Sequence, residues 1–429
     1  MSILIIDIGT TSMRGVLFDD QLVQTGLHRV SYQQQRLEDG AVTQSAYSFS
    51  DALEQICHGL RNSHTAVWAG LKVIGLTAQR SSVIPLDNKG EPLAPAMMWQ
   101  DRRAESVCGE KLGQYGTALI SICGTKPTPV FSAPKMLWIK RNRLELYEAA
   151  HKLVGIQDYL LHTLTGRFVT DASFACRSGL MDIQKKVWSE RLVQWFEIDE
   201  HKLCTLLEPG ACCGEVTESA ARRYGLPHLL PVVTAGGDQQ CAILGAGGCH
   251  CGDTVLNVGT GAYAAVIQDR PVISLDGSTA LSVAVTPGNY VVEGSIPQAG
   301  PLVDRFCAEH YGERKDWYSR LAADCAKEGS AASEMLRGLA AAAAGCVRKV
   351  DAVCEDARGS LVISGGVSRS DFFCQAVCNE LGRVLVRQKN QEATVQGALY
   401  QTLRGYEDHT SAEYVWNTMI QDRDMTFRP

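Results

Sequence analysis

Apolar runs separated by short polar turns organise the opening of the chain. Residues 2–8 form a mostly apolar, β-branched run that ends at Gly9, which predicts a buried strand. The same criteria predict further strands over residues 13–19, 22–30 and 73–77. A helix is predicted where apolar residues recur every three or four positions, at Phe49, Leu53, Ile56 and Leu60. Strands followed by a helix and another strand favour layered α/β architecture.

The second half of the chain repeats this opening. Predicted strands over residues 253–258 and 262–268 flank the turn Gly259–Gly261, as the first two strands flank the turn after Gly9. The remaining pattern predicts strands over 230–235, 291–293 and 361–363, a helix over 333–352, and a mainly helical stretch over 132–224. Duplication on this scale predicts two domains, residues 1–230 and residues 231–429.

Composition and charge narrow the class of protein. The chain has 429 residues, of which 45% are hydrophobic and 21% charged, so it is globular rather than disordered, collagenous or coiled-coil. Its 41 basic and 47 acidic residues give a net charge of −6, which offers no general attraction for nucleic acid or an anionic membrane. We therefore expect neither partner.

The start of the chain and its cysteines indicate the compartment. The N-terminal residues lack a basic segment before their short apolar run, and no apolar run is long enough to span a bilayer. Most of the 16 cysteines stand singly among apolar residues, as small core hydrophobes do. The pairs Cys212-Cys213 and Cys249-x-Cys251 lack the two-residue gap typical of a zinc or redox hairpin. We expect a reducing, cytoplasmic location.

Two similar turns carry the chemistry of anion binding. Asp7 stands at a strand end beside Gly9-Thr10-Thr11-Ser12, whose amides and hydroxyls can hold phosphoryl oxygens while the carboxylate holds Mg²⁺. The segment Asn257 to Gly261 is a second turn of this kind. Either turn alone is also compatible with an ordinary polar hairpin. Together, the two turns can face one polyphosphate across a cleft between domains.

Two glycine-rich segments follow predicted strands. In Gly236-Gly237-Asp238 the carboxylate can take a proton from a hydroxyl, and the alternative is an aspartate that caps the next helix. The segment Ser364 to Ser370 allows a flat ring or a phosphate to lie near a helix N-terminus, and the alternative is a plain turn with a serine cap. Neither the P-loop motif nor the dinucleotide fingerprint is present.

A polar and aromatic cluster suggests a site for a polyol or sugar. Gln79-Arg80 and the segment Trp99 to Arg103 combine a ring for stacking with groups that hold hydroxyls. The alternative is a surface ion-pair network beside a core tryptophan.

In this order, the segments resemble the FGGY carbohydrate kinase family of the actin, hexokinase and Hsp70-like ATPases, over nearly the whole chain. The segments that carry the resemblance, including glycerol-kinase-like and xylulokinase-like motifs, are Asp7–Ser12, Trp99–Arg103, Ile156–Leu160, Leu164–Gly166, Thr170–Ala172, Gly237–Gln240, Asn257–Gly261, Gly365–Ser370 and Glu392–Ala398. The resemblance implies two ribonuclease-H-like α/β domains with an active-site cleft between them.

The resemblance also implies roles for individual residues. Asp238 would be the general base and Asp7 the metal ligand, with ATP and Mg²⁺ as cofactors. The residues implied to line ATP are Thr10, Thr11, Ser12, Arg14, Gly259, Thr260, Gly300, Gly365, Gly366 and Ser370. Those implied to line the acceptor are Gln79, Arg80, Trp99, Asp101, Phe131, Asp238 and Gln239.

Differences from the family's sequence pattern indicate which acceptor to expect. Glycerol kinases have Glu after the arginine that matches Arg80 and an aromatic residue before the one that matches Phe131, whereas this chain has Ser81 and Val130. We therefore expect a ketose or a polyol other than glycerol. The stretch between Gly300 and Gly365 is several tens of residues shorter than is usual in the family. The alternatives left open are a catalytically weak sugar-binding or regulatory protein and an enzyme like the autoinducer kinases. A homodimer is also left open.

Overall fold

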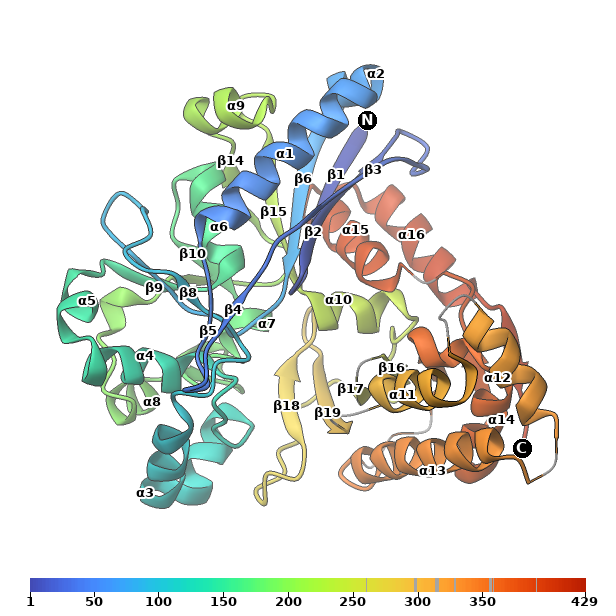
Figure 1. The fold of residues 1–429 in the computed structure, drawn as a ribbon. Helices are drawn as coiled ribbons and strands as arrows, with labels where there is room; N and C mark the ends of the chain where they lie inside the picture. Colours follow the sequence, from blue (N-terminus) through green and yellow to red (C-terminus); the bar gives the residue numbers. More distant parts are fainter. Residues whose placement is uncertain are drawn as a thin grey trace.

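Two mixed β-sheets, each covered by helices, form the two halves of the molecule (Figure 1). The computed structural model describes residues 1–259, 261–296, 299–312, 316–327, 329–354, 357, 359–390 and 392–429. The predicted α/β class is confirmed.

The first sheet has six strands, and its centre is built from the opening hairpin. Its strands, in spatial order, are β14 (Cys212–Glu215), β15 (Pro231–Gly237), β6 (Leu71–Ala78), β1 (Ser2–Ile8), β2 (Ser12–Phe18) and β3 (Gln24–Ser31). β1 pairs antiparallel with β2 and parallel with β6, and β15 runs parallel to β6. The carboxyl ends of β1, β6 and β15 therefore meet at one edge, where open α/β sheets bind their ligands.

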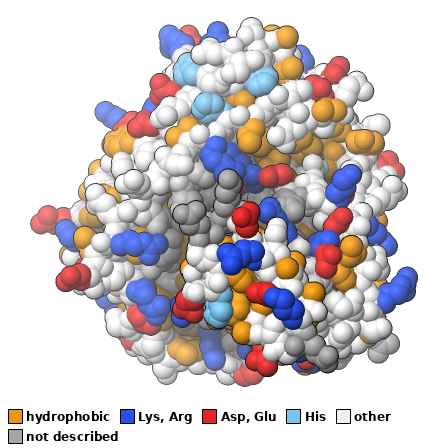
Figure 2. Space-filling view, turned by 45° about the vertical axis from the view of Figure 1, so that its right-hand side comes forward, with side chains coloured by type: hydrophobic (Ala, Val, Ile, Leu, Met, Phe, Trp, Pro, Cys, Tyr) orange, Lys and Arg blue, Asp and Glu red, His pale blue; other side chains and the backbone are white. Residues whose placement is uncertain are grey.

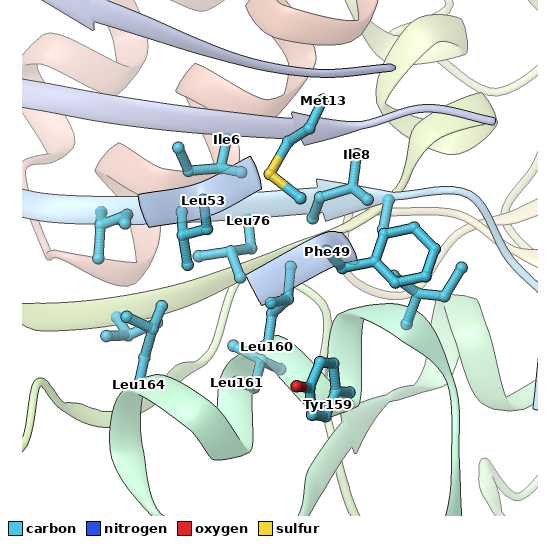
Figure 3. Close-up of a cluster of buried hydrophobic side chains, with 14 of the residues drawn as sticks. Ile6, Ile8, Met13, Phe49, Leu53, Leu76, Tyr159, Leu160, Leu161 and Leu164 are labelled. Carbon is cyan, nitrogen blue, oxygen red and sulfur yellow. The ribbon is translucent and has the colours of Figure 1, made fainter. Parts of the chain in front are cut away.

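Helices cover both faces of this sheet. On one face, α1 (Tyr47–Ser63) and α6 (Ile156–Thr165) pack their apolar sides against β1, β2 and β6. Figure 3 shows this core, with Phe49 and Leu53 of α1 beside Ile6 and Leu76 of the sheet. On the other face lie two helices from the end of the chain, α15 (Ala393–Gly405) and α16 (His409–Gln421). This packing stabilises the sheet by removing apolar side chains on both faces from water.

The second sheet has seven strands and repeats the plan of the first. Its strands, in spatial order, are β18 (Ala280–Val283), β19 (Tyr290–Ile296), β17 (Ala262–Gln268), β16 (Thr254–Val258), β20 (Leu361–Ser364), β21 (Leu385–Arg387) and β22 (Met425–Phe427). β16 pairs antiparallel with β17 and parallel with β20, as β1 does with β2 and β6. The duplicated arrangement expected from the sequence is confirmed at this level.

Helices complete both halves. α10 (Asp238–Gly245) follows β15, and the helices of the second half are α11 (Gly300–Tyr311), α12 (Trp317–Cys325), α13 (Ala331–Asp351) and α14 (Asp371–Leu381). The others are α2 (Thr65–Ala69), α3 (Glu105–Cys123), α4 (Ser132–Asn142), α5 (Leu144–Ala149), α7 (Ala172–Ala175), α8 (Glu190–Trp195) and α9 (Glu218–Tyr224). α10 lies between the two sheets (Figure 1).

Short strands also occur outside the two main sheets, and those from β9 to β13 interrupt the stretch 132–224 that was expected to be mainly helical. Small sheets pair β4 (Gln35–Arg36), β5 (Val42–Gln44) and β8 (Ala96–Met97); β7 (Ile84–Leu86) and β9 (Lys152–Val154); β10 (Val169–Asp171) and β13 (Thr205–Leu207); and β11 (Met181–Asp182) and β12 (Val187–Trp188). Segments of two or three residues are too short to show an alternating pattern, so the sequence does not reveal them.

The two sheets do not follow the predicted boundary at residue 230. β15 begins at Pro231 and belongs to the first sheet, and α15 and α16 pack on that sheet from the far end of the chain. The boundary at residue 230 stays a prediction. We propose that the second unit begins after α10 and that the chain returns to the first unit at α15.

Candidate active site

A cavity of about 650 Å³ lies where the two halves meet. The predicted residues Thr10, Gln79, Arg80, Trp99 and Phe131 line it together with Asp238 and Gln239 of α10. Tyr263 and Glu293 of the second sheet line it from the other half. These side chains come from segments far apart in the sequence. The structure therefore brings most of the predicted acceptor residues, and one residue of the first phosphate turn, around a single space.

Asp238 is the first residue of α10, directly after the buried end of β15. The helix is capped by Gly237 without a side-chain hydrogen bond, so Asp238 does not act as the aspartate cap considered as an alternative. One carboxylate oxygen accepts a hydrogen bond of 2.7 Å from the Gln239 amide, and the residue lines the cavity. Burial raises the pKa of Asp238 to about 6, although nearby Arg80 acts in the opposite direction.

Arg80 lies beside Asp238, and one nitrogen of its guanidinium has no hydrogen-bond partner. Its Nη2 donates to the Gln239 side-chain oxygen at 2.5 Å, whereas the buried Nη1 has no hydrogen-bond partner. Gly237 permits this placement, because a Cβ there would lie 2.5 Å from Cδ of Arg80. Burial, followed by the nearby Arg177, lowers the pKa of Arg80. Arg80 lines the cavity, and a buried donor without a partner is suited to an oxygen of a bound acceptor.

An ion pair between the halves forms part of the same wall and was not predicted. Arg177, just after α7, pairs with Glu293 of β19, and Gln240 donates to the other Glu293 oxygen at 3.1 Å. The Arg177 guanidinium also lies over the Phe131 ring, 5.5 Å from its centre. The sequence carried one signal for this pair, a lone glutamate inside the apolar strand Tyr290–Ile296.

The aromatic and amide side chains of the sugar-side cluster are fixed by hydrogen bonds. The Trp99 indole donates to Oγ1 of Thr10 at 3.2 Å, and Gln79 donates to the Gly9 carbonyl at 2.9 Å. The buried side-chain oxygen of Gln79 has no partner. The first phosphate turn and the acceptor side are thus held directly together.

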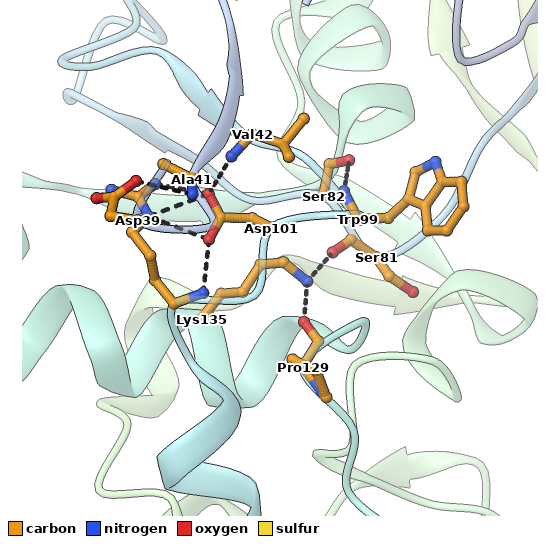
Figure 4. A network of polar contacts seen from close by, with 10 residues as sticks. Asp39, Ala41, Val42, Ser81, Ser82, Trp99, Asp101, Pro129 and Lys135 are labelled. Atoms are coloured by element: carbon orange, nitrogen blue, oxygen red, sulfur yellow. Dashed lines mark hydrogen bonds and ion pairs between the residues drawn. The ribbon is translucent and has the colours of Figure 1, made fainter. Parts of the chain in front are cut away.

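Asp101 lies apart from these groups. It is not among the residues that line the cavity, and its exposed fraction is 1%. Its carboxylate accepts the Val42 amide at 2.9 Å (Figure 4). It also pairs with Arg103 at 2.7 Å. Its predicted acceptor role stays a prediction that this arrangement does not favour, because both carboxylate oxygens already have partners.

Asp7 and Arg14 face each other across the opening hairpin. They are in register on β1 and β2, their ion pair measures 2.8 Å, and Arg14 also pairs with Glu392 at the start of α15. Burial raises the pKa of Asp7 while Arg14 opposes this. Asp7 supplies hard oxygen atoms at a strand end near Asp238, a donor type that fits Mg²⁺ held mainly by phosphate oxygens and water.

The backbone of the first turn is tightly held. The Gly9 amide donates to the Ser12 carbonyl, and the Tyr32 amide donates to the Thr11 carbonyl, both at 3.0 Å. The Thr11 side chain is exposed, so its hydroxyl is accessible to a ligand.

The predicted nucleotide residues of the second half lie around two turns. Gly259 closes the turn after β16, and its carbonyl accepts the amide of Gly300, the first residue of α11, at 2.8 Å. Thr260 lies outside the described residues. The Gly365 backbone has a φ of +95°, and a Cβ there would lie 2.5 Å from the Val258 carbonyl oxygen. Only glycine therefore fits at this crossing of the two turns.

A second cavity, of about 440 Å³, adjoins these turns. Gly365 and Gly366 line it together with Arg387, Gln388 and Lys389, which the sequence did not indicate. Ser370 is not among the lining residues; it caps α14 by accepting the Phe373 amide at 3.3 Å. The alternative of a serine cap is therefore correct for Ser370. The contact of Ser370 with ATP stays a prediction.

The surface charges, the possible metal ligands and the apolarity of the helices give little further information about the site. Figure 2 shows basic and acidic side chains interspersed over the visible face. Within the described ranges, no cluster of three or more His, Cys, Asp or Glu side chains is placed to hold a metal ion. None of the described helices combines the length and apolarity needed to cross a membrane.

Comparisons with known proteins agree with this geometry. Residues 2–245 match the N-terminal domain of the FGGY family of carbohydrate kinases, and residues 329–406 match its C-terminal domain. A xylulose kinase from Lactococcus lactis is 31% identical over 267 residues, which are 62% of this chain and 53% of that protein. A glycerol kinase from Thermococcus kodakarensis is 27% identical over 441 aligned positions, covering 93% of this chain and 87% of that protein.

Solved structures share the fold. A ligand-bound xylulose kinase from Lactobacillus acidophilus is 18% identical with a TM-score of 0.90, covering 100% of this chain and 94% of that chain. Plasmodium falciparum glycerol kinase with ADP is 22% identical with a TM-score of 0.91 over the same shares of the two chains. The family match extends over more than half of the residues and includes the first turn, Asp238 and the segment Gly365–Ser370. The chain therefore belongs to the FGGY family of carbohydrate kinases, phosphotransferases with an alcohol group as acceptor.

Proposed function

We propose that this kinase transfers the γ-phosphoryl group of ATP to a hydroxyl of a ketose or of a polyol other than glycerol. The observation that carries the proposal is the position of Asp238. Its carboxylate lines the cavity shared by the acceptor side chains and Thr10, and it is not used to cap its helix. A carboxylate in this position can accept the proton that the attacking hydroxyl loses.

Each neighbouring group has a part in this reaction. Arg80 would hold an acceptor oxygen with its free Nη1 and orient the hydroxyl toward Asp238. The amides of the two turns would hold the phosphoryl oxygens in line with the attacking oxygen. Asp7 would hold Mg²⁺, which neutralises charge on the phosphates when it is bound. The nucleotide would extend past Gly365 and Gly366 toward the second cavity.

Ser81 supports an acceptor other than glycerol. It lines the cavity beside Arg80, and its hydroxyl lies 3.5 Å from the Arg177 carbonyl. A carboxylate at this position would hold two hydroxyls, whereas serine leaves more space and fewer acceptors. A site with fewer hydrogen-bonding groups that match a short triol selects that triol less strongly over other acceptors.

The acceptor panel tests this proposal. We expect kcat/KM for the best four- to six-carbon ketose or polyol to exceed that for glycerol by about tenfold or more. The measurement is ADP release coupled to an indicator reaction, with each acceptor varied at saturating ATP and Mg²⁺. Glycerol as the best acceptor would contradict our interpretation of Ser81. Absence of both turnover and ATP binding would favour the regulatory alternative.

The raised pKa of Asp238 predicts an acid limb in the activity profile. The base works only when deprotonated, so kcat/KM is expected to fall about tenfold per pH unit below about pH 6. An ordinary aspartate would lose activity only near pH 4. The profile is measured from about pH 3.5 to about pH 8, with ATP binding followed in parallel by calorimetry. A fall confined to the region near pH 4 would show that this carboxyl does not limit the reaction.

Cytoplasmic location and the homodimer remain predictions. The same acceptor panel tests the two alternatives. Absence of turnover favours a weak or regulatory protein, and turnover of a linear polyhydroxy ketone favours an enzyme like the autoinducer kinases.

A further inference from the structure

A buried lysine lies directly behind the acceptor wall and has no role in the proposed chemistry. Lys135 is on α4, and its exposed fraction is 0%. Among the described residues, no carboxylate lies within ion-pair distance of its amine. Burial lowers its pKa to about 7, although Asp101 opposes this shift. Burying an amine costs free energy that an apolar side chain of the same size would not. A lysine at this position is therefore explained by the hydrogen bonds that its amine donates.

These hydrogen bonds all go to backbone carbonyls of two segments. The Lys135 amine donates to Pro129 at 2.6 Å, to Phe131 at 3.2 Å and to Val130. It also donates to the Ser81 carbonyl at 3.3 Å, and Figure 4 shows the amine between Ser81 and Pro129. One side chain therefore joins the loop before α4 to the segment that follows Arg80.

Both joined segments line the cavity. Ser81, Val130 and Phe131 are all part of its wall, whereas Lys135 itself is not. Ser81 has a φ of +72°, which is unfavourable for a residue other than glycine and persists only where its surroundings hold it. The bond from Lys135 to the Ser81 carbonyl is one of the contacts that hold this conformation.

We infer that Lys135 is a positioning residue for acceptor selection, because it fixes the distance between Ser81 and the loop that carries Val130 and Phe131. This inference rests on the proposed function. The two segments are the places where the chain departs from glycerol kinases, so their spacing sets the room available beside Arg80. Loss of the amine would free both segments and blur the choice between short and long acceptors.

The test is Lys135→Met, which keeps the length of the side chain and removes its donors. We expect KM for the best acceptor to rise about tenfold or more, because small displacements of positioning groups have large effects. We also expect kcat to change less than KM, the calorimetric affinity for ATP to stay within about twofold, and the preference over glycerol to shrink. Unchanged acceptor KM and preference, with only a lower melting temperature, would overturn the inference.

Lys140→Met is the matched control. Lys140 lies on the same helix and also donates to a backbone carbonyl, that of Glu197 at 2.6 Å, but it does not line the cavity. We expect its acceptor KM and preference to equal those of the parent protein. If Lys135→Met does not fold, Lys135→Gln, which keeps two donors on a shorter side chain, is expected to show a smaller shift in the same direction.

Amide hydrogen exchange separates this inference from the proposed function. Without any ligand, exchange at Val130 and Phe131 is expected to be faster in Lys135→Met than in the parent protein and in Lys140→Met. If the parent protein turns over no acceptor, the proposed function fails and exchange alone decides the role of Lys135. Equal exchange in all three proteins would overturn that role.

Discussion

Asp238→Asn is expected to lower kcat by about 100-fold or more. General-base catalysis by a positioned side chain contributes about 10² to 10⁴ in rate, and asparagine cannot accept the proton. The substitution keeps the shape of the side chain and an oxygen that can still accept the Gln239 amide. Acceptor KM and ATP affinity should therefore change little, and the loss should appear in kcat.

The control for this variant is Glu218→Gln. Glu218 is the first residue of α9, as Asp238 is of α10, but it is not among the residues that line the cavity. We expect its kcat to equal that of the parent protein. Steady-state kinetics with the best acceptor measure both variants, and circular dichroism confirms that they are folded. Turnover in Asp238→Asn comparable to that of the parent protein would exclude Asp238 as the base.

The segments around Asp238 could be predicted because their signals are local. A buried apolar strand followed by two glycines and an aspartate is visible in the sequence, and the structure places β15 and the start of α10 there. The two hairpins are local in the same sense, since each strand and its turn are contiguous. A mostly apolar run of seven residues, such as Ser2–Ile8, is long enough to reveal a buried strand.

Arg177, Glu293 and Lys135 could not be predicted, because each depends on a partner distant in sequence. Arg177 and Glu293 are 116 residues apart and meet only when the two halves assemble. Lys135 reaches Ser81 across 54 residues, and its position on a predicted helical stretch gives no indication that it is buried. Asp101 shows the reverse case, because its local setting suggests a sugar ligand while the fold pairs it with Arg103 and the Val42 amide.

The division of the chain into two units could not be predicted from local sequence patterns either. The composition does not change where α15 begins, yet α15 packs against the first sheet and crosses α10. The segment Glu392 to Ala398 carries part of the family resemblance. Thr394 does line the second cavity, but Gly397 has a packing role that only the assembled helices reveal.

Gly397 allows the backbones of α10 and α15 to touch. A Cβ at Gly397 would overlap the Cys241 carbonyl oxygen and lie 2.7 Å from its carbonyl carbon. Gly245 at the end of α10 is equally close, because a Cβ there would lie 2.9 Å from the Gly397 amide nitrogen. These neighbours are backbone atoms, so no side chain can turn aside to make room. Any added atom must move α10, and Asp238 is the first residue of that helix.

Gly397→Ala is therefore expected to destabilise the protein by about 1–3 kcal/mol, the usual cost of an overpacked core. The apparent melting temperature should fall by roughly 2–10 °C, and kcat should fall with it because Asp238 is displaced. The control is Gly338→Ala on α13, where a Cβ meets nothing within 4 Å. Alanine favours a helix over glycine by up to about 1 kcal/mol, so the control should melt at the same temperature or slightly higher. Thermal unfolding of both variants and of the parent protein measures the difference. If Gly397→Ala melts with the parent protein and retains its kcat, the close crossing of the two helices does not set the position of the base.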